Sequence, residues 1–233
     1  MATVLLVRHG RSSANHDGLL AGRTPGVLLD EVGRQQAAGL AARLAELPIA
    51  SVVSSPLERC QLTGEAIVAA LKKPVDLLTD GRLTECGYGD WTGQALKKLA
   101  KEPLWKIVQA HPSAATFPSG ESLREMQGRA VDAIRDIDAQ VTLAKGVDAL
   151  WIAVSHGDVI KAILADAVGT HLDHFQRLVV DPASVSVISY TPLRPFVLRV
   201  NEHGDLAGLT PRRKSRRRTR TTSDAAVGGG AGA

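Results

Sequence analysis

Short uninterrupted apolar runs, separated by segments of helical periodicity, constrain this 233-residue chain most. The runs at residues 3–7, 49–53 and 149–154 are too short for helices and show no polar alternation, which is typical of strands buried on both faces. Residues 30–47 and 57–71 between them carry apolar residues at helical spacing. The alternation predicts an α/β fold: a three-layer α/β/α sandwich with a mostly parallel central sheet and one antiparallel edge strand.

The remaining segments continue this pattern. We expect a third strand, further helices and a final antiparallel pair of strands, in this order: 74–78, 96–110 with a break near Pro103, 119–144, 158–168, and then 184–190 with 196–200. The glycine-rich segment 83–93, which holds Glu85, Tyr88 and Trp91, is expected to be a loop.

The composition changes near residue 209. Residues 211–220 hold seven Lys or Arg and are followed by Gly and Ala, whereas residues 1–210 have a net charge of −2. We therefore expect one folded domain over 1–208 and a disordered tail over 209–233, basic and then Gly/Ala-rich. Such a tail is either a solvated extension or a weak contact for nucleic acid or another polyanion.

No apolar run reaches the roughly 18 residues that cross a bilayer, and the first ten residues lack the basic and long apolar regions of a signal peptide. We expect a cytoplasmic protein without membrane contact. The only cysteines, Cys60 and Cys86, match neither a disulfide framework nor a zinc spacing, so free thiols are predicted. A helix N-terminus and Arg59 would favour thiolate at Cys60, whose side chain should face the core, whereas Cys86 should have more freedom in its loop.

Residues that carry chemistry follow the predicted strands. Arg8 and His9 follow the first strand, Arg59 comes shortly after the second, and His156 follows the strand at 149–154. Because ligands of parallel sheets bind beyond the carboxyl ends of strands, these side chains should converge. Two guanidinium groups suit a phosphoryl group, whose oxygens they bind bidentately. Positive neighbours would lower the pKa of His9 and leave it the free lone pair that a nucleophile needs.

Five blocks, in order, resemble the histidine phosphatase superfamily, which includes phosphoglycerate mutases and many phosphatases. The blocks are residues 8–15 (RHGRSSAN), 22–25 (GRTP), 54–63 (SSPLERCQLT), 83–93 (LTECGYGDWTG) and 155–157 (SHG). Each block is short, but the resemblance spans residues 3 to about 200 and the blocks fall at strand ends or loops, which makes the set far more specific than any one triplet.

The resemblance implies a role for each matching residue. His9 would be the nucleophile and form a phosphohistidine, and Arg8, Asn15, Arg59 and His156 would bind the phosphoryl oxygens. Phosphoryl transfer needs mainly positioning and charge stabilisation, so we expect no metal and no cofactor.

Glu85, by the same resemblance, would protonate the leaving oxygen and later deprotonate the attacking water, which requires a raised pKa. Arg11 stands where the family often has an acid, and could add charge at the pocket rim. Weaker candidates for substrate binding share matching positions around the pocket: Ser12, Gly22, Arg23 and Gly157.

A metal-independent phosphatase acting on a small phosphomonoester is the implied function, and a phosphomutase using the same pocket is the alternative. Residues 91–118 lack the long arginine-rich insertion associated with the mutases, which favours hydrolysis. The motifs identify a phosphoryl group but not the rest of the substrate, and they leave the oligomeric state open.

Overall fold

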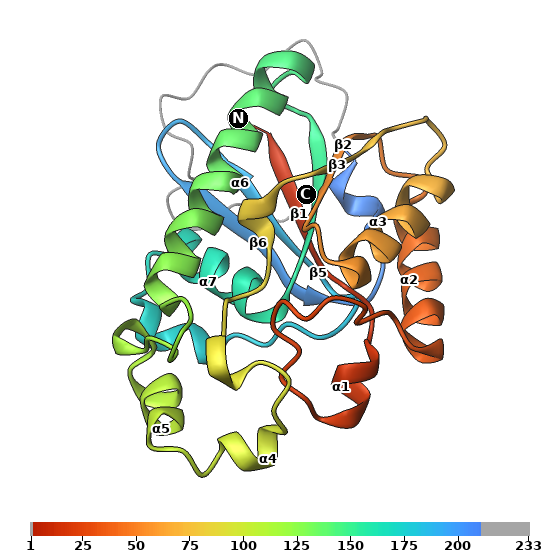
Figure 1. Cartoon of the computed structure of the whole chain (residues 1–233). Coiled ribbons are helices and arrows are strands. Elements are labelled where there is room, and N and C mark those ends of the chain that lie inside the picture. The colour runs from red at the N-terminus through yellow and green to blue at the C-terminus, as the bar shows by residue number, and fades with distance from the viewer. Residues whose placement is uncertain (1, 211–233) are drawn as a thin grey trace.

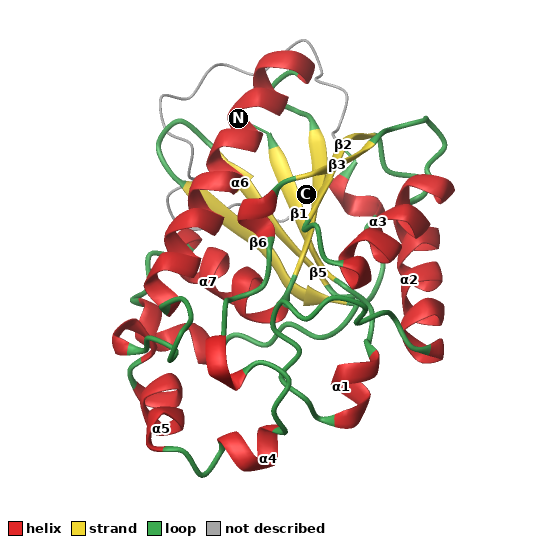
Figure 2. Ribbon diagram, in the orientation of Figure 1, coloured by secondary structure: helices red, strands yellow, loops and turns green. Residues whose placement is uncertain are grey.

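The computed structural model describes residues 2–210. Six strands form one sheet in the order β3-β2-β4-β1-β5-β6 (Figure 2). Neighbours among the first four strands are parallel, and β5 is antiparallel to both β1 and β6. The strands are β1 (Thr3–Arg8), β2 (Ile49–Ser54), β3 (Leu77–Thr79), β4 (Leu150–Ser155), β5 (Val185–Tyr190) and β6 (Pro195–Glu202).

Helices cover both faces of the sheet (Figure 1). One layer holds α2 (Glu31–Leu44) and α3 (Glu58–Ala70), and the other holds α6 (Leu123–Lys145) and α7 (Gly157–Ala167). Three short helices lie at the end of the sheet where the parallel strands finish: α1 (Ser13–Asp17), α4 (Leu96–Leu99) and α5 (Pro103–Ala110). The predicted three-layer α/β/α sandwich is confirmed.

Differences from the expected elements are local. The antiparallel strand is β5, one position in from the edge, and β6 forms the edge. The third strand is shorter and later than residues 74–78, and α1 had not been expected because a single helical turn has no measurable periodicity.

Side-chain caps explain where two of the helices that cover the sheet, α2 and α6, begin. The Asp30 side chain accepts a hydrogen bond from the Gly33 N–H at 2.7 Å and so starts α2. At α6, Ser122 and Glu125 form a reciprocal capping box, which starts the helix at Leu123 rather than near residue 119.

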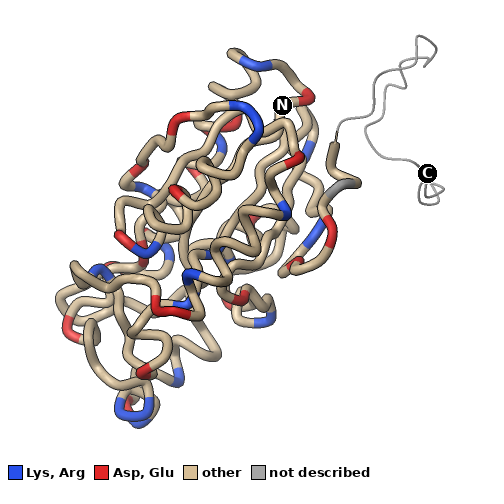
Figure 3. Tube along the Cα trace, turned by 90° about the vertical axis from the view of Figure 1, so that its right-hand side faces the viewer, with Lys and Arg blue, Asp and Glu red and all other residues tan. Residues whose placement is uncertain are grey.

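The centre of the sheet is buried on both faces, and all six residues of β4 are buried, whereas the edge strands β3 and β6 are partly exposed. Acidic and basic positions are interspersed along the surrounding elements (Figure 3). Within residues 2–210, no helix combines the length and apolar character that crossing a membrane requires. Leu206 is buried and Leu209 packs against the core cluster behind α2 and α3. The basic run predicted for the tail lies outside the described residues.

Candidate active site

Three neighbouring strand ends bring the candidate residues together. Arg8 at the end of β1 pairs with Ser155 at the end of β4, and Ser54 at the end of β2 pairs with Val154. The residues that come next are His9, His156 and Ser55, so all three start from the same edge of the sheet. The parallel strands end side by side and bring the residues that follow them to one edge of the sheet, as expected.

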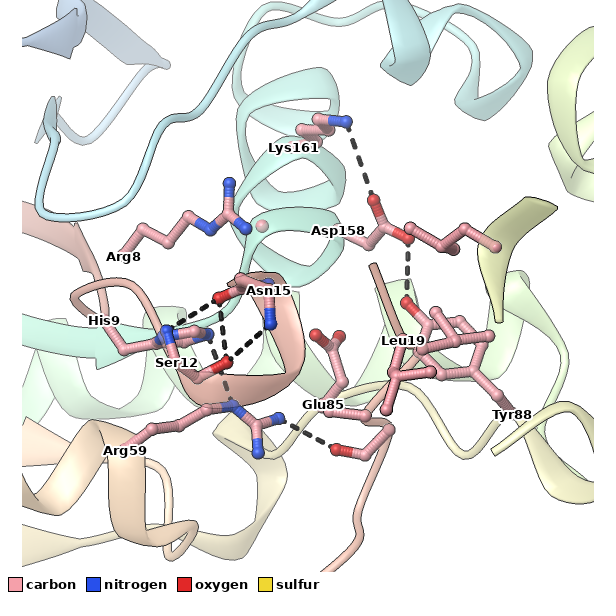
Figure 4. Close-up of a pocket in the computed structure, with 15 residues that line it drawn as sticks. Arg8, His9, Ser12, Asn15, Leu19, Arg59, Glu85, Tyr88, Asp158 and Lys161 are labelled. Carbon is pink, nitrogen blue, oxygen red and sulfur yellow. Dashed lines mark hydrogen bonds and ion pairs between the residues drawn. The ribbon is translucent and has the colours of Figure 1, made fainter. Parts of the chain in front are cut away.

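A cavity of about 250 Å³ opens at this edge (Figure 4). Eight of the residues expected at the site line it: Arg8, His9, Ser12, Asn15, Gly22, Arg59, Glu85 and Gly157. Seven further residues complete the lining: Leu19, Leu20, Ala21, Tyr88, Leu96, Asp158 and Lys161. Of the remaining candidates, His156 lies behind the cavity wall and Arg23 lies outside it.

His9 is held as a neutral imidazole in one tautomer. Its Nδ1 lies 2.7 Å from the Gly10 carbonyl oxygen, which can only accept, so Nδ1 carries the proton. Its Nε2 accepts from Arg59 Nε at 3.3 Å and therefore has the lone pair. Burial, followed by the charges of Arg59 and Arg8, holds the pKa of His9 well below its usual range. The result is an unprotonated Nε2 at the cavity.

The two arginines still have donors to offer. Arg59 is fully buried and its NH2 donates to the Gly22 carbonyl at 2.8 Å, but its NH1 has no hydrogen-bond partner. Arg8 donates from NH1 to the Val180 carbonyl at 2.6 Å, and its buried Nε is also unpartnered. Both arginines line the cavity, where the oxygens of a phosphoryl group would be acceptors for their guanidinium groups.

Gly22 presents its carbonyl to Arg59 from a left-handed backbone conformation, with φ 52°. A Cβ at this position would lie 2.9 Å from Thr92 Oγ1, so only glycine fits here without displacing a neighbour.

His156 is fully buried behind Arg59. Its Nδ1 lies 3.2 Å from Arg59 NH2, a group that can only donate, so its Nε2 carries the proton toward Ser55 Oγ at 2.8 Å. Burial, then Arg59 and His9, lowers the pKa of His156 well below its usual range. The Nδ1 edge also faces Glu85, whose Oε2 is 3.8 Å away.

Small groups at two helix starts complete the phosphoryl side. Asn15 Oδ1 accepts from the Ser12 N–H and hydroxyl at 3.1 and 2.9 Å, which caps α1 and leaves the Asn15 amide N–H groups for the cavity. Gly157 is the first residue of α7, where the helix dipole presents partial positive charge, and a Cβ there would touch Arg8 at 3.4 Å.

Glu85 faces these cations across the cavity (Figure 4). Its side chain is 13% exposed, and burial followed by the negative charge of Asp158 raises the pKa of Glu85 to about 7. Oε1 accepts from the Cys86 N–H at 2.9 Å. Near neutral pH, a carboxyl with this pKa is protonated in about half of the molecules, so it can both donate and accept a proton.

Tyr88, Asp158 and Lys161 form a wall of the cavity that sequence reasoning missed. The Tyr88 hydroxyl donates to Asp158 Oδ2 at 2.8 Å, and Lys161 Nζ lies 3.6 Å from Asp158 Oδ1. Their spacing could have predicted them. Asp158 and Lys161 are three residues apart on the helix that follows His156, and residues at this spacing share a helix face.

Arg11 and Trp91 do not reach the cavity. Arg11 Nε pairs with Asp30 Oδ2 at 2.6 Å, so the expectation that it adds charge at the pocket rim is wrong. Trp91 stacks on Trp105 with ring centroids 6.2 Å apart and meets Phe117 edge-on, which makes it a packing group of the acid-bearing loop.

Both cysteines are free thiols, as predicted, and Cys60 faces the core as expected. Cys86 is fully buried, so the freedom expected from its loop position is absent. Cys60 Sγ lies 3.5 Å from His156 Nε2, yet burial outweighs the Arg59 charge and raises the pKa of this thiol to about 12. The expected thiolate at Cys60 is therefore wrong, because the helix dipole and one guanidinium do not offset full desolvation.

Comparisons with known proteins agree with this geometry. The chain is 28% identical over 207 residues to phosphoserine phosphatase 1 of Hydrogenobacter thermophilus, covering 86% of this chain and 92% of that protein. It is 30% identical over 195 residues to the “probable phosphoglycerate mutase GpmB” of Shigella boydii, covering 82% and 86%. The chain also spans 54% of the length of mycobacterial relatives that match it at 33% identity.

Among solved structures, the fold matches a mycobacterial glucosyl-3-phosphoglycerate phosphatase complexed with VO3, with a TM-score of 0.77 and 22% identity over 86% of this chain and 99% of that one. The sequence model of the histidine phosphatase superfamily (branch 1) matches residues 4–203. The chain therefore belongs to the histidine phosphatase superfamily.

Proposed function

We propose that this enzyme hydrolyses phosphomonoesters through a phosphohistidine at His9, without a metal ion. The observation that carries the proposal is the unprotonated Nε2 of His9, in a cavity that Arg8 and Arg59 also line. A nucleophilic nitrogen surrounded by fixed cations suits a phosphoryl group and little else of comparable size.

In the first step, the Arg59 Nε–H moves from His9 Nε2 to a phosphoryl oxygen, and the released lone pair of Nε2 attacks phosphorus. The N–P bond forms and the bond to the leaving oxygen breaks. Arg8, Arg59 and the Asn15 amide bind the three phosphoryl oxygens, and the Glu85 proton goes to the leaving alkoxide. His156 keeps its unprotonated Nδ1 toward Arg59 and so fixes that guanidinium against His9. The product alcohol then departs.

In the second step, the carboxylate of Glu85 takes a proton from water, which attacks the phosphohistidine. The N–P bond breaks, inorganic phosphate forms, and His9 returns to its resting tautomer. A single residue acts as acid and then as base because its pKa lies near neutrality.

Phosphoryl transfer between two substrates, as in a mutase, is the second candidate, and the similarity to GpmB favours it. The segment that connects Trp91 to α6 argues for hydrolysis: it contributes only the apolar Leu96 to the cavity lining, with no arginine or lysine. A panel of phosphorylated metabolites, including phosphoserine and phosphoglycerates, assayed for both phosphate release and phosphoryl transfer decides. Transfer that exceeds release would overturn the hydrolase assignment.

We propose a separate, weaker role for the basic residues 211–220, which lie outside the described part of the chain. Seven cations in ten residues would hold a polyanion at low salt. Deleting residues 211–233 should abolish polyanion binding and leave turnover of nitrophenyl phosphate unchanged. The cytoplasmic location is proposed on the sequence argument above, and cell fractionation tests it.

A further inference from the structure

Three charged side chains from distant parts of the sequence meet beneath the loop that carries Glu85. Glu121, in the turn before α6, receives Arg23 NH2 on Oε2 at 2.8 Å and Arg129 Nε on Oε1 at 2.6 Å. Arg23 comes from the rim loop, residues 18–29 between α1 and α2, and Arg129 comes from α6. The carboxylate of Glu121 thus bridges two guanidinium groups.

Both guanidinium groups also converge on one main-chain atom, the carbonyl oxygen of Glu85. Arg23 Nε donates to it at 2.8 Å, and Arg129 NH2 donates at 3.1 Å. Arg129 NH1 reaches the Thr84 carbonyl as well, at 2.8 Å. The backbone of the general-acid candidate is therefore held from two sides by side chains that do not line the cavity.

Close backbone packing reinforces these contacts on the other side of Glu85. Glu121 accepts the Gly87 N–H on Oε2 at 3.0 Å and returns its own N–H to the Gly87 carbonyl at 2.7 Å. Gly89 has φ +51°, and a Cβ there would lie 2.0 Å from the Pro118 carbonyl oxygen. Residues 85–89 are thus seated on the turn 118–121 with no room for side chains between them.

We propose that Glu121, Arg23 and Arg129 form a positioning clamp for Glu85, with Arg23 tying the acid-bearing loop to the rim loop that lines the same cavity. The inference rests on the acid role of Glu85 proposed above. The clamp fixes the carbonyl of the residue whose carboxyl must meet the leaving oxygen. Loosening it leaves the phosphoryl side intact and displaces the proton donor, and a displacement of about 1 Å costs on the order of 10²-fold in rate.

This role differs from the substrate contact that the sequence suggested for Arg23. Its side chain is about half-exposed, lies outside the cavity lining, and is directed to Glu85 and Glu121. A substrate-binding arginine would act on KM for every substrate. A positioning arginine acts on kcat, and only where the leaving group needs a proton.

The test is Arg23→Gln, measured with an alkyl phosphate and with nitrophenyl phosphate, whose anion leaves unaided. We expect kcat for the alkyl phosphate to fall about tenfold, within the range expected for a misplaced catalytic group. Both KM values and kcat for nitrophenyl phosphate should stay within about twofold of wild type, because the phosphoryl side is untouched. Arg23→Lys keeps the charge but replaces the planar fork, whose Nε and NH2 reach the two acceptors, with a single ammonium nitrogen, so its loss should be intermediate.

Two reference variants make the result decisive. Arg135→Gln removes an ion pair of similar exposure, between Arg135 on α6 and Asp166 at 2.8 Å. It should change neither kcat nor KM for either substrate. Glu85→Gln sets the full size of the leaving-group effect. If Glu85→Gln discriminates between the substrates and Arg23→Gln does not, the clamp is wrong; if Glu85→Gln does not discriminate either, the acid role fails and the clamp with it. Equal kcat losses on both substrates, or a rise in both KM values, would also overturn the positioning role of Arg23.

Discussion

The two halves of the pocket are built by different means. The phosphoryl half, Arg8, His9, Arg59 and His156, starts from strand ends and the first turn of α3, and strand register fixes its place. The leaving-group half is built from the rim loop, the loop of Glu85 and one face of α7, and ion pairs and backbone contacts fix its place. Rigid position in the first half is a property of the fold, whereas in the second it depends on individual side chains.

Their electrostatics differ in the same way. The phosphoryl half combines two arginines with imidazoles that are neutral in the resting enzyme, and it neither gives nor takes a proton in the proposed reaction. The leaving-group half contains Glu85, whose charge must change twice per turnover and whose pKa is raised by burial and by the neighbouring Asp158. Replacing a residue of the first half should therefore lower turnover of every substrate. Replacing a residue of the second half should lower turnover only for some substrates or only at some pH values.

The largest effect is expected for His9→Ala, which removes the nucleophile from the phosphoryl half. Turnover should fall by roughly 10³-fold or more for alkyl and aryl phosphates alike. Acid-labile, alkali-stable label from a radioactive phosphoryl donor should appear on wild-type protein and be lost in the variant. Label that persists in the variant, or is found on Ser or Asp, contradicts the mechanism; strict dependence of activity on a divalent metal, seen as inactivation by EDTA, would do so as well.

Glu85→Gln should give the next largest effect, and a selective one. An alkoxide needs a proton as it leaves, so turnover of alkyl phosphates should fall about 10²-fold or more, while nitrophenyl phosphate changes little. Steady-state kcat on a series of leaving groups measures this as a steeper dependence on leaving-group pKa. Equal losses across the series would remove Glu85 from the acid role and leave Asp158, which also lines the cavity, as the next candidate.

A smaller, pH-dependent effect is expected for Asp158→Asn. Asp158 is the second cause, after burial, of the raised pKa of Glu85, so removing its charge lowers that pKa toward the ordinary value. The acid works protonated, and the alkaline limb of kcat for an alkyl phosphate should move to lower pH, with a few-fold loss above about pH 7 and little change below about pH 6.

Asparagine keeps an oxygen for the Tyr88 hydroxyl, which limits structural damage from the replacement. The control is Asp132→Asn, an exposed acid on α6 that does not line the cavity and should leave the profile unchanged. A limb that stays in place, or moves to higher pH, would show that Asp158 does not act on Glu85.

The same contrast explains what the sequence predicted. His9, Arg59 and His156 could be brought together in advance because each follows a buried strand closely, and parallel strands end at one edge. Most strands, the helices that cover the sheet and the Asp30 cap could be predicted because they follow from local sequence patterns. Asp158 and Lys161 were missed because they line the cavity only for one orientation of α7, and a single sequence does not specify that orientation.

The clamp was beyond sequence reasoning on different grounds. Arg23, Glu121 and Arg129 are separated by up to 106 positions, and no periodicity links an exposed loop arginine to a turn carboxylate. Full burial of Cys86 had the same origin, because loops sit on the surface as a rule and this one is covered by the turn 118–121. Long-range packing of loops is the part of the fold that local patterns encode least.

The smallest effect is expected for alkylation of the two cysteines, which measures local opening of each half of the pocket. Burial raises the pKa of both thiols, so each reacts with a small alkylating reagent only after local opening. Cys60 lies in α3 against His156, and Cys86 lies in the irregular loop of Glu85, which opens at lower free-energy cost than a packed helix. We expect slow inactivation through Cys86, and phosphate or vanadate in the pocket should slow it further by stabilising the closed state.

Arg23→Gln should speed modification of Cys86 but not of Cys60, because the clamp holds only the leaving-group half. Mass spectrometry after limited alkylation measures both sites, and full activity with Cys86 modified, or a loss that follows Cys60, would show that the halves do not differ in this way.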